Sequence, residues 1–527
     1  MRLSQTSLVT CVLLAAACVP AASLRAQAGK PTPIAVPAGT ATPKPAVRTT
    51  TKRPAAKKPA PRPALKARQP NDAIALASDL RSLISLSTNR GRWGVMVISL
   101  TNGDTLFEQD ADELLLPAST MKLYTAAIAL ENFGPAHQFR TEVLRDGELL
   151  PNGRLDGSLY LVGAGDPSIS PRYASWHDGV KPMDALADLV VASGVRHVEG
   201  DIIGDASAFD SQRIPAGWRS RYLQAGYAAR VSALSFNGNI AHVVVSASAR
   251  GARVDFDQPV PGMNLTSTVK LRTGSRGAAV RVWQDTVSDR FRVSGWIGAL
   301  SRPRTYQVVV EQPERFAASA FRGALEARGV TVRGDVDVAP APATAMRLTA
   351  WASPSLAQLV AQMNGESDNH FAELLFRNAA RSTGSIGSVG TANESLRAFL
   401  SARVGVRPDA VFAADGSGLS TLNRVTARSM VQLLSYTDRA PWGSVLRASL
   451  PVAGMTETLK DRMRRTPAQG NLRGKTGTTN EVTSLGGYVT ARNGEQLAFS
   501  FLYNGADLWR ARAAIDAMGI TLASFSR

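Results

Sequence analysis

The chain contains the sequence Leu116-Pro117-Ala118-Ser119-Thr120-Met121-Lys122-Leu123-Tyr124, which predicts the start of a buried helix because a proline stands at its entry and apolar residues follow. On a helix, residues three positions apart lie on one face, so Ser119 and Lys122 are expected to point into the same cavity. A partly desolvated lysine has a lowered pKa and can take the proton of a hydroxyl, which makes the oxygen a nucleophile. Alone, a Ser-x-x-Lys pattern is a weak signal, since about two matches are expected by chance in such a chain.

Length and composition predict a large globular protein of more than one domain, because the chain has 527 residues, 44% of them hydrophobic and 19% charged. Residues 1–28 are typical of a secretory signal peptide. Arg2 gives a positive start, residues 8–22 are apolar, and Ala26-Gln27-Ala28 is a small-residue cleavage site. The apolar run is too short to suit a membrane-spanning helix, although an uncleaved anchor stays an alternative.

Both cysteines of the chain, Cys11 and Cys18, lie inside this signal segment. A chain cleaved after Ala28 would hold no disulfide and no thiolate metal site. Lipidation of Cys18 is an alternative, because a degenerate lipoprotein-like sequence precedes it. The five histidines show no metal-ligand spacing, so we expect no metal and no cofactor.

Residues 29–71 are rich in Pro, Ala, Lys, Arg and Thr, and they hold ten Lys or Arg but no Asp or Glu. Proline favours extended conformations and like charges repel, so this segment is predicted to be a disordered linker. It carries more than half of the formal net charge of +18. It is either a plain spacer or a contact to an anionic surface, such as membrane phosphates or acidic wall polymers. Nucleic acid is not an expected partner, since export separates the chain from it and no aromatic-basic motif is present.

Strand patterns near both ends of the remaining chain predict one sheet built from both ends. Residues 93–100 and 105–108 flank an Asn102-Gly103 turn, and residues 483–489 and 496–503 flank an Asn493-Gly494 turn. Further helical patterns lie after residue 350, over 355–363, 369–381, 392–404, 426–437 and 506–525.

The region between residues 139 and 349 has a different pattern, in which short β-like runs dominate. We interpret it as one or two inserted, mostly β domains with short helices. The runs cover residues 158–162, 197–203, 242–246 and 306–310, and the helices are expected over 182–193 and 315–327.

Two more motifs follow Ser119 in a definite order. Ser367-Asp368-Asn369 precedes a predicted helix, with Asn369 where a cap could sit, and Lys475-Thr476-Gly477-Thr478 stands before the last strand pair. A Lys-Thr-Gly alone is expected only ~0.1 times by chance. The ordered set of three is typical of class A β-lactamases and penicillin-binding proteins, so the chain resembles a penicillin-recognising serine acyltransferase.

Further segments narrow the resemblance to the D-alanyl-D-alanine carboxypeptidase/endopeptidase family, also called class C low-molecular-mass penicillin-binding proteins, the DacB family or peptidase family S13. The similar segments are residues 159–167, 232–237 and 415–420, and the resemblance covers about residues 75 to 525. It implies an α+β fold: a β-lactamase/transpeptidase-like domain, with an antiparallel sheet flanked by helices, carries two nested, mostly β inserted domains. The expected parts are residues 72–138 and 350–527 for that domain and 139–349 for the insertion.

The resemblance also implies roles for the first two motifs. Ser119 would attack the carbonyl of a D-Ala-D-Ala peptide bond, and Lys122 would accept the hydroxyl proton, although the acylation base is disputed across the superfamily. Ser367 would pass a proton to the departing amine. Asn369 would hold the substrate amide and help to place Lys122.

In the third motif, Lys475 would supply positive potential, while the hydroxyls of Thr476 and Thr478 would bind the terminal carboxylate. Gly477 would leave room for close backbone approach. The backbone N–H groups of Ser119 and Thr478 would form the oxyanion hole.

One departure from the family concerns the third residue of the stem peptide. In the family, an acidic residue after a Gly-Trp can face the side-chain amine of diaminopimelate. This chain has Gly217-Trp218-Arg219-Ser220-Arg221-Tyr222-Leu223-Gln224 there, with two arginines and no acid. A modified or different stem peptide is therefore an alternative substrate.

The sequence thus predicts a periplasmic serine-type D-Ala-D-Ala carboxypeptidase that also cuts D-Ala-diaminopimelate cross-links in peptidoglycan and binds β-lactams covalently. A β-lactamase is less favoured, since fast deacylation usually needs a dedicated water-activating base and the long insertion has no obvious use there. A non-catalytic wall-binding scaffold is the alternative from another class, and the intact Ser119, Lys122, Ser367 and Lys475 speak against it.

Overall fold

The computed structural model describes residues 65–88, 90–285, 290–382 and 384–527. The predicted signal peptide and the predicted linker up to residue 64 lie outside the described residues. Residues 65–71, the end of that predicted linker, belong to a folded unit that begins at Pro63. Arg68, for example, forms an ion pair of 3.0 Å with Asp79. None of the helices in the described ranges has both the length and the hydropathy that crossing a bilayer requires.

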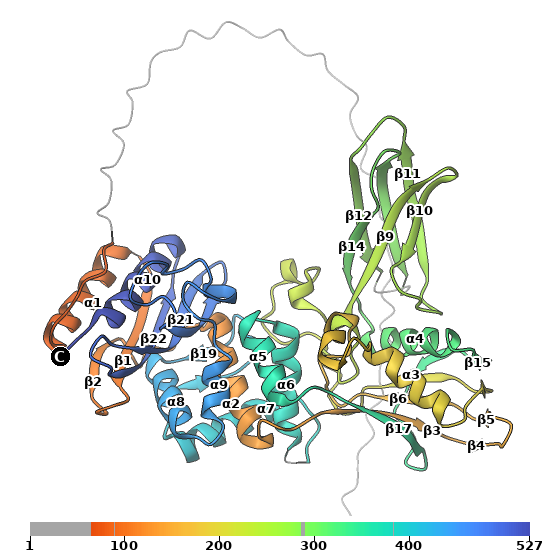
Figure 1. The fold of residues 1–527 in the computed structure, drawn as a ribbon, viewed down its shortest axis with the longest axis horizontal. Helices are drawn as coiled ribbons and strands as arrows, with labels where there is room; N and C mark the ends of the chain where they lie inside the picture. Colours follow the sequence, from red (N-terminus) through yellow and green to blue (C-terminus); the bar gives the residue numbers. More distant parts are fainter. Residues whose placement is uncertain (1–64, 89, 286–289, 383) are drawn as a thin grey trace, which may run out of the picture. The chain divides into compact units, whose positions relative to one another are not determined.

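The central sheet is built from both ends of the described chain, as predicted (Figure 1). Its order is β2-β1-β22-β21-β20, and all neighbouring strands are antiparallel. Strand β20 stands at an edge of the sheet, where β21 is its neighbouring strand; on its other side, its first residue, Arg473, forms an isolated bridge with Val452. The strands are β1 Arg92–Ser99, β2 Thr105–Gln109, β20 Arg473–Thr478, β21 Val482–Thr490 and β22 Gln496–Asn504.

Helices cover both faces of this sheet. They are α1 Ala73–Ser87, α2 Met121–Phe133, α5 Leu356–Gly365, α6 Asn369–Arg381, α7 Val389–Phe399, α8 Ala427–Arg439, α9 Gly443–Ala448 and α10 Leu508–Ser524. Helices α1 and α10 pack on the face to which Phe499 and Phe501 of β22 point. Helices α2 and α8 pack on the opposite face with Leu502. Because both faces are covered, β21 is buried along nearly its whole length.

Helix α2 forms the centre of a helical lobe, since every residue from Met121 to Leu130 is buried. It packs against α5, α6 and α7. The predicted helix over 392–404 is observed as α7 followed by a π-helical turn, Leu400–Val404. The sequence had not predicted α1, which Asp72 caps by accepting a hydrogen bond from the Ala75 N–H at 2.8 Å.

The first inserted domain leaves the helical lobe at β3 and returns through β17, which pairs with β3. It holds a five-stranded sheet of order β16-β8-β6-β3-β17 and a smaller sheet of order β15-β7-β5-β4. Two helices, α3 Pro182–Ala192 and α4 Pro313–Glu326, pack with these sheets. The strands are β3 Arg140–Arg145, β4 Glu148–Leu149, β5 Arg154–Asp156, β6 Leu159–Val162, β7 His197–Val198, β8 Ile202–Asp205, β15 Thr331–Val332, β16 Val336–Val338 and β17 Met346–Ala352.

The second inserted domain is nested within the first and contains two three-stranded sheets, of orders β10-β9-β14 and β11-β13-β12. Figure 1 shows its strands extending away from α3 and α4. The architecture is therefore α+β with two nested, mostly β inserted domains, as predicted. The strands are β9 Ile240–Ser248, β10 Gly251–Phe256, β11 Leu265–Arg272, β12 Ala278–Gln284, β13 Phe291–Gly298 and β14 Arg304–Val309.

One β-like run was interpreted wrongly as a single segment. Residues 197–203 are divided between β7 and β8, which belong to different sheets. Between them the N–H of Gly200 donates to the Gly157 carbonyl at 2.9 Å, and the N–H of Asp201 donates to Ser158 Oγ at 3.0 Å. These long-range partners redirect the chain at a point where local hydropathy gives no signal.

Candidate active site

Ser119 lies in a short 3-10 turn, Ala118–Thr120, directly before α2. Ala118 has a φ of 48°, in the left-handed region that a non-glycine residue rarely adopts. The turn is held from outside by Gly418, whose φ is 85° and whose position leaves no room for a Cβ beside the Ala118 carbonyl. Packing against the loop around Gly418 therefore fixes a turn that the local sequence would not adopt alone.

Lys122 follows one turn later on α2 and lies at the centre of three interactions. Its Nζ is 3.2 Å from Ser119 Oγ, 2.7 Å from Asn369 Oδ1 and 2.8 Å from the Ser417 carbonyl oxygen. A neutral amine has two N–H donors and one lone pair. If Asn369 and Ser417 accept the two donors, the lone pair points toward the Ser119 hydroxyl, which is the arrangement a base requires.

The surroundings of Lys122 favour that neutral form. The side chain is fully buried, and burial lowers its pKa to about 8. The negative charges of Asp415, Glu373 and Asp368 act in the opposite direction and limit the decrease. A substantial neutral fraction of Lys122 is therefore present near neutral pH.

The second and third predicted motifs meet on the other side of the site. Lys475 Nζ donates to Ser367 Oγ at 2.9 Å and to the Thr476 carbonyl at 2.9 Å. Burial, aided by the positive charge of Lys122, lowers the pKa of Lys475 well below its ordinary value. Ser367 has a φ of 59°, which turns its side chain toward Lys475 just before α6 begins.

The cap of α6 is Asp368, not Asn369 as the sequence suggested. The Asp368 carboxylate accepts from the Phe371 N–H at 3.2 Å. The Asn369 side chain is thereby free to accept from Lys122 and to donate, through Nδ2, to the Tyr227 carbonyl at 2.8 Å. Asn369 thus connects the helical lobe to the inserted domain.

Strand β20 passes directly beside the Ser119 turn. A Cβ added to Gly477 would lie 2.7 Å from the Pro117 carbonyl oxygen and 3.1 Å from the Ser119 nitrogen, so only glycine fits there. Thr478 is exposed and lines the same cavity as Ser119. Thr476 is different, because its hydroxyl donates to Thr458 Oγ1 at 3.1 Å and the residue does not line that cavity.

The cavity in front of Ser119 has a volume of about 340 Å³ and takes its walls from the transpeptidase-like domain and the first inserted domain. Two tyrosines from the first inserted domain, Tyr222 and Tyr227, form one wall. No carboxylate lines it. The lining residues are Ser119, Tyr222, Tyr227, Ser367, Asn369, Gly418, Leu419, Thr478, Thr479 and Asn480.

The segment that carries these tyrosines is anchored on the transpeptidase-like domain. The Trp218 indole donates to Asp415 Oδ2 at 2.8 Å. The Arg219 guanidinium forms an ion pair of 2.8 Å with Glu481, next to β20. Arg221 is exposed, and its guanidinium carbon lies 5.1 Å from the Tyr222 ring centroid. Arginines therefore stand beside the tyrosines that line this cavity.

Glu373, on α6 one turn after Asn369, is a site residue that sequence reasoning missed. Its buried carboxylate accepts from the Ser417 N–H at 2.9 Å and from the Gly416 N–H at 3.3 Å. It thus holds the loop whose Ser417 carbonyl faces Lys122. Burial, then the charge of Asp415, raises the pKa of Glu373 to about 7. The sequence signal that could have identified Glu373 is an acidic residue on the apolar, buried face of the predicted helix over 369–381.

Asp415, in the same loop, accepts hydrogen bonds from several donors. The N–H groups of Gly418 and Ser420 donate at 2.8 and 2.6 Å, and the Asn423 side chain donates at 2.7 Å. With the Trp218 indole, these donors stabilise a fully buried carboxylate. Asp415 therefore connects the Ser119 turn, the Lys122 site and the inserted domain.

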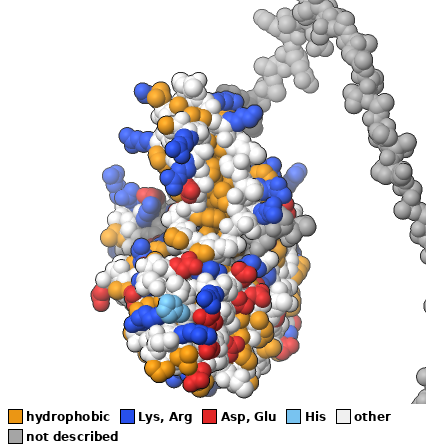
Figure 2. All heavy atoms as spheres, turned by 90° about the vertical axis from the view of Figure 1, so that its right-hand side faces the viewer, with side chains coloured by type: hydrophobic (Ala, Val, Ile, Leu, Met, Phe, Trp, Pro, Cys, Tyr) orange, Lys and Arg blue, Asp and Glu red, His pale blue; other side chains and the backbone are white. Residues whose placement is uncertain are grey.

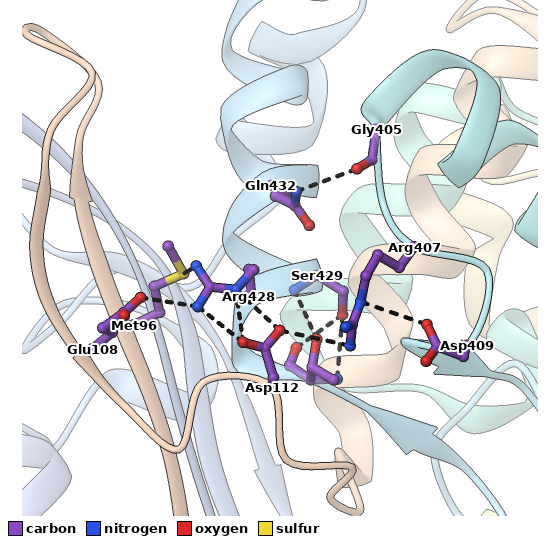
Figure 3. Close-up of polar contacts among 10 residues, drawn as sticks. Met96, Glu108, Asp112, Gly405, Arg407, Asp409, Arg428, Ser429 and Gln432 are labelled. Carbon is purple, nitrogen blue, oxygen red and sulfur yellow. Dashed lines mark hydrogen bonds and ion pairs between the residues drawn. The ribbon is translucent and has the colours of Figure 1, made fainter.

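The connection before Ser119 is held by an ion-pair cluster at the start of α8, drawn in Figure 3. The Arg428 guanidinium binds Asp112 Oδ2 at 2.9 Å and Glu108 Oε2 at 3.0 Å. Its backbone N–H also donates to the Ala111 carbonyl at 2.9 Å. The hydrogen bond from Arg428 lowers the pKa of the Asp112 carboxyl. This cluster positions the segment between β2 and the nucleophile and contains no residue of the cavity.

Across the described ranges, no group of three or more His, Cys, Asp or Glu residues is arranged to hold a metal ion. His370, beside Asn369, is enclosed, and burial lowers its pKa to about 4.

Comparison with known proteins gives matches over most of the chain. The family described as "D-Ala-D-Ala carboxypeptidase 3 (S13) family" matches residues 76–525. A D-alanyl-D-alanine carboxypeptidase of Actinomadura sp. (strain R39) is 36% identical over 449 residues, which cover 82% of this chain and 81% of the relative. The D-alanyl-D-alanine carboxypeptidase DacB of Haemophilus influenzae is 26% identical over 78% of this chain and 85% of the relative.

A similar fold is known from crystal structures. Penicillin binding protein 4 (dacB) from Haemophilus influenzae superimposes with a TM-score of 0.72 at 24% sequence identity, covering 84% of this chain and 98% of that chain. A second structure of the same protein, complexed with a β-lactam, gives a TM-score of 0.66 at 23% identity over the same shares.

Proposed function

The chain belongs to the D-Ala-D-Ala carboxypeptidase 3 (S13) family, and from this premise we propose how its site performs serine-type D-Ala-D-Ala carboxypeptidase chemistry. The observation that carries the proposal is the hydrogen-bonded arrangement of Ser119, Lys122 and Asn369 opposite Lys475 and Ser367 around one cavity. The substrate is the peptidoglycan stem peptide, and β-lactams, which resemble its D-Ala-D-Ala end, bind covalently.

Acylation begins when the Ser119 hydroxyl loses its proton to the neutral Lys122 amine. The oxygen forms a bond to the carbonyl carbon of the D-Ala-D-Ala peptide bond, and the carbonyl electrons move onto its oxygen. The N–H groups of Ser119 and Thr478 stabilise that oxyanion; removal of one such donor costs about 3 kcal/mol in a well-studied hydrolase. The proximity of Gly477 to the Ser119 nitrogen supports this placement.

The departing D-alanine amine takes its proton from Ser367. Lys475 replenishes that hydroxyl through the 2.9 Å hydrogen bond between them. The negative charge of the substrate's terminal carboxylate favours the protonated form of Lys475, and this ammonium binds the carboxylate together with the Thr478 hydroxyl. The Thr476 hydroxyl joins them after exchanging its bond to Thr458 for the substrate.

Deacylation begins when Lys122 releases its extra proton to solvent and then accepts a proton from the attacking water, whose oxygen bonds to the ester carbonyl carbon. That proton passes to the Ser119 oxygen as the ester bond breaks, and the shortened stem peptide leaves as the acid.

The free edge of β20 supports binding of an extended peptide. An edge strand offers unpaired N–H and C=O groups, so a stem peptide can align along it as an added strand. The same acyl transfer would cut D-Ala-diaminopimelate cross-links. The proposal therefore includes endopeptidase activity.

The arginines beside this cavity support a substrate without a free side-chain amine at the third stem position. No carboxylate lines the cavity, and Arg221 is the exposed charge beside Tyr222. A free ammonium there would meet a like charge, whereas an acylated or amidated side chain would not. Arg221→Glu should raise kcat/KM for a peptide with a free side-chain amine relative to its N-acetylated form. The exposed Arg140→Glu carries the same charge change elsewhere and should leave that ratio unchanged.

Residues 1–28 direct export, and the mature enzyme acts in the periplasm. The positive start, the apolar run and the Ala26-Gln27-Ala28 site support this. The ten cations of residues 29–71 support contact with an anionic membrane or wall surface. N-terminal sequencing of the secreted protein should begin after Ala28. Recovery only from the cytoplasm would contradict the assignment.

Covalent labelling by a fluorescent penicillin tests the reaction itself. The wild-type protein should be labelled, and Ser119→Ala should not be. Digestion of purified peptidoglycan should then release D-alanine from pentapeptides and separate cross-linked dimers. Equal labelling of both proteins would exclude Ser119 as the nucleophile, and penicillin turnover of many per second would favour a β-lactamase.

A further inference from the structure

The second inserted domain ends in a cluster of three turns, one between β9 and β10, one between β11 and β12 and one between β13 and β14. The last two are bonded together: the N–H of Ala299 donates to the Arg272 carbonyl at 2.8 Å, and the N–H of Leu300 donates to the Ser275 carbonyl at 3.0 Å. We call residues 248–253, 270–281 and 296–305 the distal end. In Figure 1 it lies at the tip of the strands, away from α3 and α4.

The distal end is strongly cationic. Its three segments contain eight Lys or Arg and no Asp or Glu. Among ion pairs between described residues, only that of Arg253 with Asp255, at 2.6 Å, involves one of these eight. Figure 2 shows Lys and Arg side chains along this part of the surface. The cations are Arg250, Arg253, Lys270, Arg272, Arg276, Arg281, Arg302 and Arg304.

So many like charges on one small domain repel each other and do not stabilise its fold. Arg250, Arg276 and Arg302 in the turns and Arg304 at the start of β14 are exposed, and no residue of the catalytic cavity lies in these segments. The charge therefore points to an anionic partner outside the substrate site.

Apolar groups at the same tip indicate what kind of anionic partner fits. Leu300 is 61% exposed at the end of the β13–β14 turn, two positions before Arg302. Trp296, on the adjoining strand, is half-buried under Arg272, whose guanidinium carbon lies 4.1 Å from the ring centroid. An exposed aliphatic side chain, a tryptophan and arginines together are typical of surfaces that enter the lipid headgroup region. A soluble polyanion has no apolar region that Leu300 could enter, so the exposed leucine would not contribute to binding it.

We propose that the distal end of the second inserted domain docks on a bilayer surface that contains anionic phospholipids. The arginines bind headgroup phosphates, and Leu300 enters the boundary with the acyl chains. This interaction goes beyond the hydrolase activity, because it places the enzyme at a membrane without using a catalytic residue. It is also separate from the segment 29–71.

Vesicle co-sedimentation of the full mature chain tests the proposal. One set of vesicles is phosphatidylcholine alone, and the other contains phosphatidylglycerol at about three parts in ten. Binding should require phosphatidylglycerol and weaken with added salt. A cation near such a surface contributes about fivefold to affinity, so Arg250→Ser with Arg276→Ser and Arg302→Ser should weaken binding about a hundredfold. Leu300→Ser should weaken it about tenfold.

A matched triple variant controls for net charge. Arg140→Ser, Arg439→Ser and Arg492→Ser remove three exposed arginines elsewhere and should leave most of the binding intact. Unchanged thermal unfolding midpoints establish that each variant is folded. Equal losses in the two triple variants would overturn the proposal. So would undiminished vesicle binding by Leu300→Ser combined with tight binding of soluble polyphosphate, because that result assigns the tip to a soluble polyanion.

Discussion

Lys122 combines full burial with three polar neighbours, and only one of them, the Ser119 hydroxyl, can give it a proton. The other two, Asn369 Oδ1 and the Ser417 carbonyl, are acceptors that direct the amine. The protonation state of Lys122 therefore decides whether the nucleophile is activated. Burial lowers the pKa of Lys122 to about 8, so the reaction rate should change with pH in a range that can be measured.

We expect the rate of Ser119 acylation to rise with pH and to level off above about 8, because only neutral Lys122 has a lone pair. At pH 6 the rate should be roughly a hundredfold below the plateau. Single-turnover labelling with a fluorescent penicillin between about pH 6 and pH 10 measures the profile. A flat profile would show that another group is the base.

Glu373→Gln tests the carboxylate behind the Ser417 loop. Its negative charge raises the pKa of Lys122, so its removal should move the rising limb of the profile to lower pH. The plateau should also fall about tenfold, because a glutamine can satisfy only one of the two backbone N–H groups. Measurement of the labelling rate against pH separates the two effects.

Glu373→Asp is the matched control, since it keeps the charge but shortens the reach to Gly416 and Ser417. It should lower the plateau while moving the limb less than Glu373→Gln does. An unmoved limb in Glu373→Gln would mean that the charge of Glu373 does not raise the pKa of Lys122.

At the scale of elements, the site depends on β20 lying against the Ser119 turn. The contact is backbone to backbone, between Gly477 on the strand and Pro117 and Ser119 in the turn. Strand β20 also carries Lys475 and Thr478, so its distance from the turn sets the position of all three groups. A glycine at 477 is required by this approach.

Gly477→Ala should slow acylation by at least about a hundredfold, because the added Cβ displaces β20 from the Ser119 turn, and catalysis is sensitive to shifts of about 1 Å. Penicillin labelling kinetics measure the loss. Gly390→Ala, on α7, adds the same methyl group where the nearest atom would be 3.7 Å away, and it should label like the wild type. Equal labelling rates for Gly477→Ala and Gly390→Ala would show that acylation does not depend on the close approach of β20 to the Ser119 turn.

At the scale of the whole molecule, the first inserted domain completes the catalytic cavity. Tyr222 and Tyr227 line it, and the Tyr227 carbonyl accepts from Asn369. Trp218 joins this segment to the buried Asp415, which also holds the loop beside Lys122. The insertion is thus part of the active site, although it interrupts the transpeptidase-like domain in sequence.

Trp218→Phe should therefore affect both stability and reaction. Loss of the indole donor should lower the free energy of unfolding by about 1–2 kcal/mol, because Asp415 is fully buried. Acylation should slow as the loop loosens. Denaturant unfolding and penicillin labelling provide the two readouts. The control variant Trp283→Phe, in the second inserted domain, should leave the acylation rate unchanged. An unchanged acylation rate in Trp218→Phe would show that the hydrogen bond between Trp218 and Asp415 does not affect the reaction.

The local pattern of residues was sufficient for the main elements of the fold. Period-two runs and Asn-Gly turns located β1, β2, β21 and β22, and period-3.6 runs located α5, α6 and α8. The three ordered motifs predicted residues that the structure brings together, namely Ser119 with Lys122 and Asn369, and Ser367 with Lys475. These features depend on neighbours close in sequence or on side-chain chemistry that the family motif preserves.

What the sequence alone determined was therefore most of the elements, the order of the motifs and which residues meet around the candidate site. Only the tertiary structure decided that Asp368 caps α6, that residues 197–203 divide between two sheets, and that Glu373 holds the loop facing Lys122. The physical reason is common to these cases. Each outcome depends on a hydrogen-bond partner that is distant in sequence: Lys122 and the Tyr227 carbonyl engage the Asn369 side chain and leave the cap to Asp368, and long-range backbone and hydroxyl groups bind residues 200–201 and Glu373.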